Sequence, residues 1–170
     1  MERLDPVYLS DLVVKAQGGS SNACAELYGA SVQQQYGYAC RCLLDENAGK
    51  ETTKDAAREA LKEVYMQMIH NIRSLQSPAL FTAWLSSLTF RACLEKMEDA
   101  AGEDTPVQAG GGTWTLRQIL NLPLTESQVT LMRYYQKLKT QYIADLLNMS
   151  GSSVRRYLRS AQEHLKRLEF

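Results

Sequence analysis

The 170-residue sequence lacks any apolar run near the roughly 20 residues that a bilayer span requires. It begins Met1-Glu-Arg-Leu-Asp-Pro, without the basic and apolar segments of a secretory signal peptide. We therefore expect a soluble, cytoplasmic protein with no direct membrane insertion. Its hydrophobic share of 45% is enough for one medium core or two small ones, and it excludes the disordered and fibrous classes.

Metal-binding residues are few and badly spaced, with four cysteines and two histidines in the whole chain. The nearest pair, Cys40 and Cys42, is one residue short of a Cys-x-x-Cys unit. On a helix, with ~100° per residue, these two side chains would point about 200° apart. The pattern favours buried, reduced cysteines in a reducing compartment and predicts no metal site.

Catalytic signatures are also absent. The sequence contains no GxxxxGK phosphate loop, no GxSxG nucleophile turn and no HExxH zinc helix. We expect a protein that is not an enzyme and needs no cofactor.

The net charge of zero conceals two oppositely charged parts. Residues 1–114 hold 10 Lys and Arg against 15 Asp and Glu, a net charge of −5, whereas residues 115–170 hold 9 against 4, a net charge of +5. Nucleic-acid binders usually carry a basic surplus. The distribution indicates that the second part contacts a polyanion.

Apolar residues recur at helical spacing through most of the chain, which predicts an all-α fold. One continuous apolar stripe lies in residues 58–72 and comprises Leu61, Val64, Tyr65, Met68, Ile69 and Ile72. Residues 98–112 have no such periodicity and contain four acidic residues, one proline and four glycines. We therefore predict two small helical domains, 1–97 and 113–170, joined by a flexible linker.

Residues 140–159 have the spacing of a helix-turn-helix motif. Ala144 is small enough to let two helices cross closely. Asn148 tolerates the left-handed conformation that the turn needs, and Val154 points back into the core. Four further residues of the second helix follow the same inward face, namely Leu158, Ala161, Leu165 and Leu168.

The opposite face of that second helix carries Ser152, Ser153, Arg155, Arg156 and Arg159. A recognition helix uses its amino-terminal end in the major groove, where arginine can form two hydrogen bonds with guanine. Charged residues on a generic helix more often form a solvated face. The turn geometry favours DNA binding here.

The order of these parts resembles a bacterial RNA polymerase sigma factor of the small extracytoplasmic-function type. The resemblance covers nearly the whole chain and rests on four stretches: LVVKAQGGSSNACAELYGASVQQQYGYACRCL, REALKEVYMQMIHNI, FTAWLSSLTFRA, and LPLTESQVTLMRYY followed by QYIADLLNMSGSSVRRYLRSAQEHLKRL. It implies two helical domains and two direct partners, core RNA polymerase and promoter DNA. It also implies an anti-sigma factor as a further partner.

The resemblance implies a role for each domain. Residues 1–97 would bind core polymerase and the −10 element, and residues 113–170 would bind the −35 element through the recognition helix. The implied polymerase contacts are Glu59, Glu63, Tyr65 and Gln67, and the implied −10 contacts are Arg73, Trp84, Ser87 and Arg91. The chain departs from the family where basic residues are usual in the tryptophan helix, because it has Thr82, Ser87 and Phe90 there.

Two other classes fit parts of the sequence. A helix-turn-helix repressor with a ligand-sensing first domain would be a dimer that binds a palindromic operator. A sigma-like adaptor would hold a partner or an inhibitor without initiating transcription, in keeping with the neutral residues of the tryptophan helix.

Overall fold

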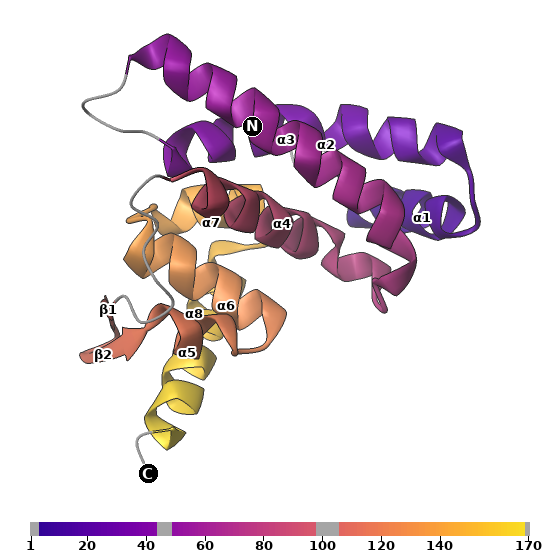
Figure 1. The fold of residues 1–170 in the computed structure, drawn as a ribbon. Helices are drawn as coiled ribbons and strands as arrows, with labels where there is room; N and C mark the ends of the chain where they lie inside the picture. Colours follow the sequence, from indigo (N-terminus) through magenta and orange to yellow (C-terminus); the bar gives the residue numbers. More distant parts are fainter. Residues whose placement is uncertain (1–3, 44–48, 98–105, 169–170) are drawn as a thin grey trace. The chain divides into compact units, whose positions relative to one another are not determined.

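A computed structural model describes residues 4–43, 49–97 and 106–168 of the chain (Figure 1). The predicted all-α class is confirmed, with one small two-stranded sheet as the exception. The chain forms two compact units, Glu2–Ala100 and Ala101–Phe170. We describe each unit by itself.

The first unit is a helical bundle. It consists of α1 (Pro6–Gln17), α2 (Ser21–Cys42), α3 (Lys50–Asn71), the short 3-10 turns η1 (Ile72–Ser74) and η2 (Pro78–Leu80), and α4 (Phe81–Lys96). The Asp5 carboxylate caps α1 and the Ser20 hydroxyl caps α2, each accepting a hydrogen bond from a backbone N–H that the helix leaves unsatisfied. Both long helices α2 and α3 pack against α4.

The core of the first unit joins apolar faces of all four helices. Leu12 of α1, Leu27 of α2, Val64 of α3 and Leu85 of α4 are among its buried members. The apolar stripe predicted for α3 lies in this core except for Ile69, which is 57% exposed. Because an α-helix turns ~100° per residue, so wide a stripe cannot be buried completely against one side.

Polar side chains also connect the helices inside this unit. The amide of Gln35 in α2 donates to Ser86 Oγ (3.1 Å) and accepts from Thr89 Oγ1 (2.8 Å) in α4, and all three residues are buried. A buried amide group costs free energy unless it is hydrogen-bonded. This network therefore fixes the register of α2 against α4.

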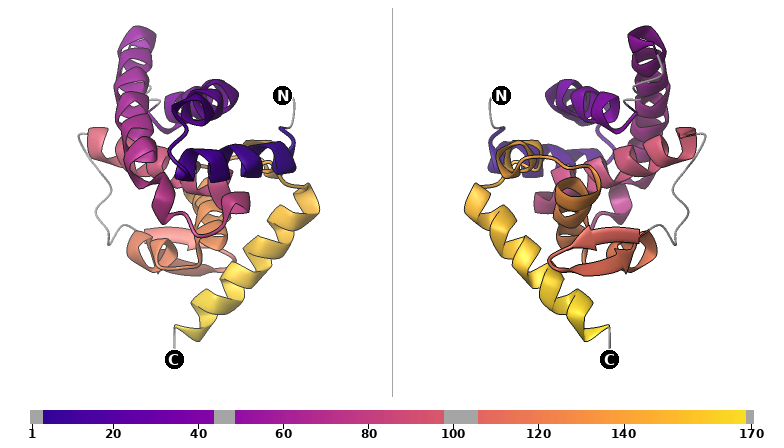
Figure 2. Two further views of the ribbon diagram at one scale, coloured as in Figure 1. Left: turned by 90° about the vertical axis from the view of Figure 1, so that its right-hand side faces the viewer. Right: turned by 90° about the vertical axis from the view of Figure 1, so that its left-hand side faces the viewer.

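The second unit begins with a hairpin and continues as helices (Figure 2). Its elements are β1 (Pro106–Ala109), β2 (Gly112–Thr115), α5 (Leu116–Leu120), α6 (Leu124–Thr130), the π-helical turn η3 (Leu131–Tyr135), α7 (Thr140–Leu146) and α8 (Gly151–Arg167). Helix α8 packs against both α6 and α7. The last residue of its predicted inward face, Leu168, is the C-cap and is 58% exposed.

The hairpin corrects the predicted linker. Residues 106–112 were expected to be spacer, but β1 and β2 pair in antiparallel fashion, with Val107 opposite Trp114 and both side chains buried. Gly110 and Gly111 form the two-residue turn with φ of 58° and 86°, a conformation that glycine adopts without steric cost. A Cβ at Gly110 would lie 2.3 Å from Gln162 Nε2 of α8. Residues 98–105 of the predicted linker lie outside the described residues.

Candidate functional site

The predicted turn between α7 and α8 is present. Asn148 has φ of 55°, and the Met149 N–H donates to Ala144 O at 2.8 Å. A left-handed residue followed by this hydrogen bond is the Schellman type of helix end. Ala144 and Val154 are fully buried, so that α7 and α8 meet through small and branched apolar side chains as the spacing predicts.

The amino-terminal turns of α8 present the predicted recognition face. Ser152, Arg155, Arg156 and Arg159 are exposed, and Ser153 is half-buried. Their spacing places the three arginines and Ser152 along one side of the helix, opposite Val154 and Leu158. The structure thus brings these predicted residues together on one surface.

The residues of this face are held differently. Ser150 Oγ caps α8 by accepting from the Ser153 N–H (3.1 Å), and it also hydrogen-bonds the Ser152 hydroxyl (3.0 Å). The Arg156 guanidinium lies 5.2 Å from the centre of the Tyr157 ring, within the range of a cation–π contact. Arg155 has no ion pair with any residue in the described part of the chain and is available to a ligand.

A polar cluster behind this face was not predicted. Glu126 of α6 is buried, and its carboxylate accepts from Ser160 Oγ (2.7 Å) and lies 2.6 Å from His164 Nδ1, both on α8. The cluster joins α6 to α8 and so orients the recognition helix. Its members are more than 30 positions apart in sequence, a separation at which local spacing carries no signal.

The predicted polymerase contacts divide into two groups. Glu59, Glu63 and Gln67 are exposed on α3. Lys96 of α4 lies 3.1 Å from Glu63 Oε1 and 3.6 Å from Glu59 Oε2, and its hydrogen bond with Glu63 raises the pKa of the lysine. The two carboxylates therefore already have a basic partner within the same unit.

Tyr65 does not lie on this surface and is corrected to a core residue. It is only 6% exposed, its ring meets the Tyr28 ring edge-on at 4.8 Å, and its hydroxyl is 2.8 Å from Ser31 Oγ. Burial raises the pKa of Tyr65, so the hydroxyl stays protonated and serves as a hydrogen-bonding group. Its aromatic side chain stabilises the packing of α2 on α3.

Three of the four predicted −10 contacts share one side of α4. Trp84, Ser87 and Arg91 follow one another at intervals of three and four residues. Trp84 and Ser87 are half-buried and Arg91 is exposed. Arg73 lies on η1, exposed, at the other end of the connection between α3 and α4.

The connection that carries Arg73 is fixed by a residue that the sequence did not single out. The Gln17 side chain at the end of α1 donates from Nε2 to the backbone oxygens of Ile72 (3.0 Å) and Leu75 (2.8 Å). These bonds satisfy carbonyl groups that η1 leaves unpaired. A glutamine in this position has no distinctive sequence signal.

Other kinds of site were examined in the described residues. No group of three or more His, Cys, Asp or Glu side chains there could hold a metal ion. None of the helices within 4–43, 49–97 and 106–168 has the length and apolarity needed to cross a membrane. All four cysteines are thiols, with Cys93 buried and the others half-buried.

Comparison with known proteins gives no assignment from sequence, since no family model and no curated protein matches the chain. Two solved structures are similar to it. One is the structure of CnrH in complex with the cytosolic domain of CnrY, with 15% identity and a TM-score of 0.48, covering 96% of this chain and 97% of that chain. The other is the RsbN–BldN complex, with 19% identity and a TM-score of 0.40, covering 92% of this chain and 98% of that chain. The functional argument therefore rests on the residues of the chain itself.

Proposed function

We propose that the chain is a sigma-like transcription initiation factor that binds core RNA polymerase and directs it to promoters. In this proposal residues 1–97 bind the polymerase and the −10 element, and residues 113–170 bind the −35 element. The observation that carries it is the α7–α8 helix-turn-helix, whose exposed arginines lie in the part of the chain with a net charge of +5. The described residues hold no metal site that would favour an enzyme.

The recognition face has the chemistry for reading a base pair. Arginine offers a planar fork of N–H donors that matches the O6 and N7 acceptors of guanine in the major groove. Arg155 stands within two turns of the amino terminus of α8, the end that enters the groove in helix-turn-helix proteins. Arg159, one turn further along the same side, is placed to contact a phosphate or a neighbouring base.

We expect Arg155→Ala to weaken binding to a selected DNA site by about 1 to 3 kcal/mol and to relax the preference at one base pair. The full chain would first select its preferred site from a pool of randomised duplexes. Fluorescence anisotropy on that site and on single-base variants then measures the change. Lys166→Ala, at the far end of α8, is the control and should change affinity little. An equal loss on every duplex would show that Arg155 contacts only phosphate.

The polymerase part of the proposal is tested by co-elution. The full chain mixed with core RNA polymerase should elute with it at moderate salt and direct transcription from a cognate promoter. Glu63→Lys should weaken this association about tenfold or more, because it puts a like charge beside Lys96 on the proposed docking face. Glu95→Lys, the same charge change at an exposed position of α4, is the matched control. Failure of the unmodified chain to co-elute would refute the proposal.

A second candidate is a sigma-like adaptor that binds the polymerase without initiating transcription. The observation that favours it is the low positive charge of α4, where Lys96 is engaged with Glu59 and Glu63 and Arg91 is the other basic residue. Phosphate attraction depends on such charges. Co-elution without transcription, on DNA that the second unit binds, would identify the adaptor.

A further inference from the structure

An apolar groove runs between α2 and α3 in the first unit. It has a volume of about 590 Å³ and its apolar lining residues are Tyr28, Val32, Tyr36, Leu61, Tyr65, Met66 and Ile69. Three of them are unusually exposed for their type, with 49% for Tyr28, 55% for Met66 and 57% for Ile69. Water-exposed apolar surface of this kind, gathered in one groove, is typical of a site that another protein covers.

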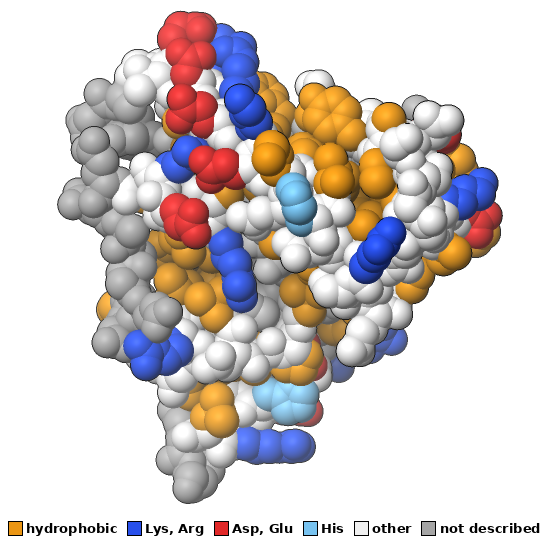
Figure 3. All heavy atoms as spheres, turned by 45° about the vertical axis from the view of Figure 1, so that its right-hand side comes forward, with side chains coloured by type: hydrophobic (Ala, Val, Ile, Leu, Met, Phe, Trp, Pro, Cys, Tyr) orange, Lys and Arg blue, Asp and Glu red, His pale blue; other side chains and the backbone are white. Residues whose placement is uncertain are grey.

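Helix α3 carries two parallel ridges of opposite charge beside this groove. The basic ridge is Lys50, Lys54, Arg58 and Lys62, and the acidic ridge is Glu51, Asp55, Glu59 and Glu63, each with a step of four residues. Figure 3 shows acidic and basic side chains next to one another on this face, with hydrophobic side chains beside them. Arg58 and Lys62 line the groove, whereas Glu59 and Glu63 lie near Lys96 of α4. The basic ridge thus borders the groove.

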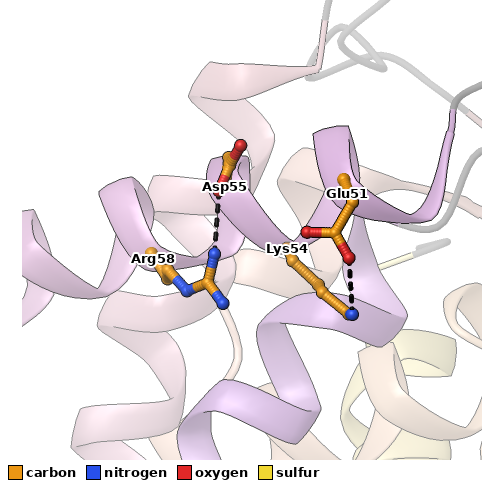
Figure 4. Close-up of polar contacts among 4 residues, drawn as sticks. All are labelled: Glu51, Lys54, Asp55 and Arg58. Carbon is orange, nitrogen blue, oxygen red and sulfur yellow. Dashed lines mark hydrogen bonds and ion pairs between the residues drawn. The ribbon is translucent and has the colours of Figure 1, made fainter.

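Ion pairs between the ridges stop before Lys62. Glu51 pairs with Lys54 and Asp55 pairs with Arg58, each at 2.8 Å (Figure 4). The next pair in the series would join Glu59 to Lys62, but Lys96 lies beside Glu59. Lys62 therefore has no acidic partner among the residues that the structure describes. An exposed cation at the edge of an apolar groove is complementary to a carboxylate on the occupant.

We propose that this groove binds an amphipathic helix of a partner protein, with apolar side chains in the groove and carboxylates facing Lys62 and Arg58. A groove between two helices accepts the ridge of a third, as in other helix-in-groove complexes. Along α3 the lining residues extend from Arg58 to Ile69, a length of about 16 Å at 1.5 Å per residue. This length accommodates three turns of the incoming helix.

This proposal goes beyond the proposed function and does not depend on it. Polymerase docking is assigned to the acidic ridge, on the side of α3 that faces Lys96, whereas the groove lies on the side that faces α2. A second copy of the chain is a poorer occupant. If two α3 helices met face to face in antiparallel orientation, each basic ridge would oppose the other basic ridge.

Two synthetic helical peptides of equal length test the proposal. Both carry leucines at positions i, i+3, i+4 and i+7, and they differ only in having Glu or Lys beside the leucines. Fluorescence anisotropy of the labelled peptides is measured with the full-length chain. We expect the Glu peptide to bind about tenfold more tightly than the Lys peptide, with the difference decreasing at high salt.

Variants of the full chain locate the binding site. Lys62→Glu should weaken the Glu peptide about tenfold and reverse the preference, and Ile69→Ser should weaken both peptides. Lys15→Glu, the same charge change on exposed α1, is the control. Circular dichroism of each variant confirms that it is folded. Equal binding of the two peptides, or no effect of Lys62→Glu, overturns the proposal.

Sedimentation of the chain without peptide provides the other arm. A monomer supports the partner helix as occupant. A dimer that Lys62→Glu dissociates would assign the groove to a second copy and overturn the proposal. Because Glu63→Lys reports on polymerase association and Lys62→Glu on the peptide, failure of one assignment is distinguishable from failure of the other.

Discussion

Val154→Asp is expected to unfold the second unit while the first unit stays folded. Val154 is fully buried in α8, which packs on α6 and α7. A carboxylate in this position would be removed from water without a basic partner, which places the substitution among those that cost more than about 4 kcal/mol. That is a large part of the roughly 5 to 15 kcal/mol that stabilises a small domain.

The two tryptophans allow each unit to be measured in the full chain. Trp114 belongs to the second unit and is buried, and Trp84 belongs to the first unit and is half-buried. In a Trp84→Phe background, Val154→Asp should shift the emission of Trp114 to longer wavelength. In a Trp114→Phe background, the emission of Trp84 should not change.

Ser152→Asp is the matched control for this prediction. It introduces the same carboxylate two residues earlier, at an exposed position in the first turn of α8. A negative charge near a helix amino terminus is favourable. The control should therefore keep the Trp114 signal. If Val154→Asp also kept it, the placement of the turn would be wrong.

The helix-turn-helix was predictable because each of its restrictions acts within a few residues. A small residue at Ala144, a left-handed residue at Asn148 and an inward apolar residue at Val154 are all fixed by the geometry of two adjacent helices. The structure has φ of 55° at Asn148 and buries the other two side chains. Which base pairs the exposed face reads stays a prediction.

The hairpin could not be predicted by the same reasoning, because its strands have only four residues each. Two glycines in succession signal a tight turn as well as a flexible spacer. What decides between them is tertiary: Trp114 is buried and donates from its indole to Ala109 O at 3.1 Å. Gly110 approaches Gln162, which is 52 positions away in the printed sequence.

Tyr65 and Ile69 show a related limit in α3. Both belong to one apolar stripe, four residues apart, and the sequence treats them alike. In the structure Tyr65 is buried against α2, where it contacts Tyr28 and Ser31, whereas Ile69 stays exposed in the groove. Periodicity gives the direction of a helix face, but the neighbouring helix determines how much of that face is covered.

Gln35→Ala is expected to destabilise the first unit by about 2 to 4 kcal/mol, the sum of a cavity and of hydrogen bonds lost in the core. Gln35 is fully buried, and its amide is bonded to Ser86 and Thr89 of α4. Thr89 can still donate to Leu85 O, at 3.1 Å. Ser86 loses the bond from the amide and remains buried, so the network cannot be repaired completely.

Urea unfolding followed through Trp84, in the Trp114→Phe background, measures this loss in the unit concerned. Gln33→Ala is the matched control, since it removes the same side chain from an exposed position of α2 and should change the free energy of unfolding by less than about 0.5 kcal/mol. Equal effects of the two substitutions would mean that the Gln35 network does not stabilise the packing of α2 on α4. A selective loss at Gln35 would show that the bundle which presents Trp84, Ser87 and Arg91 depends on polar contacts as well as on its apolar core.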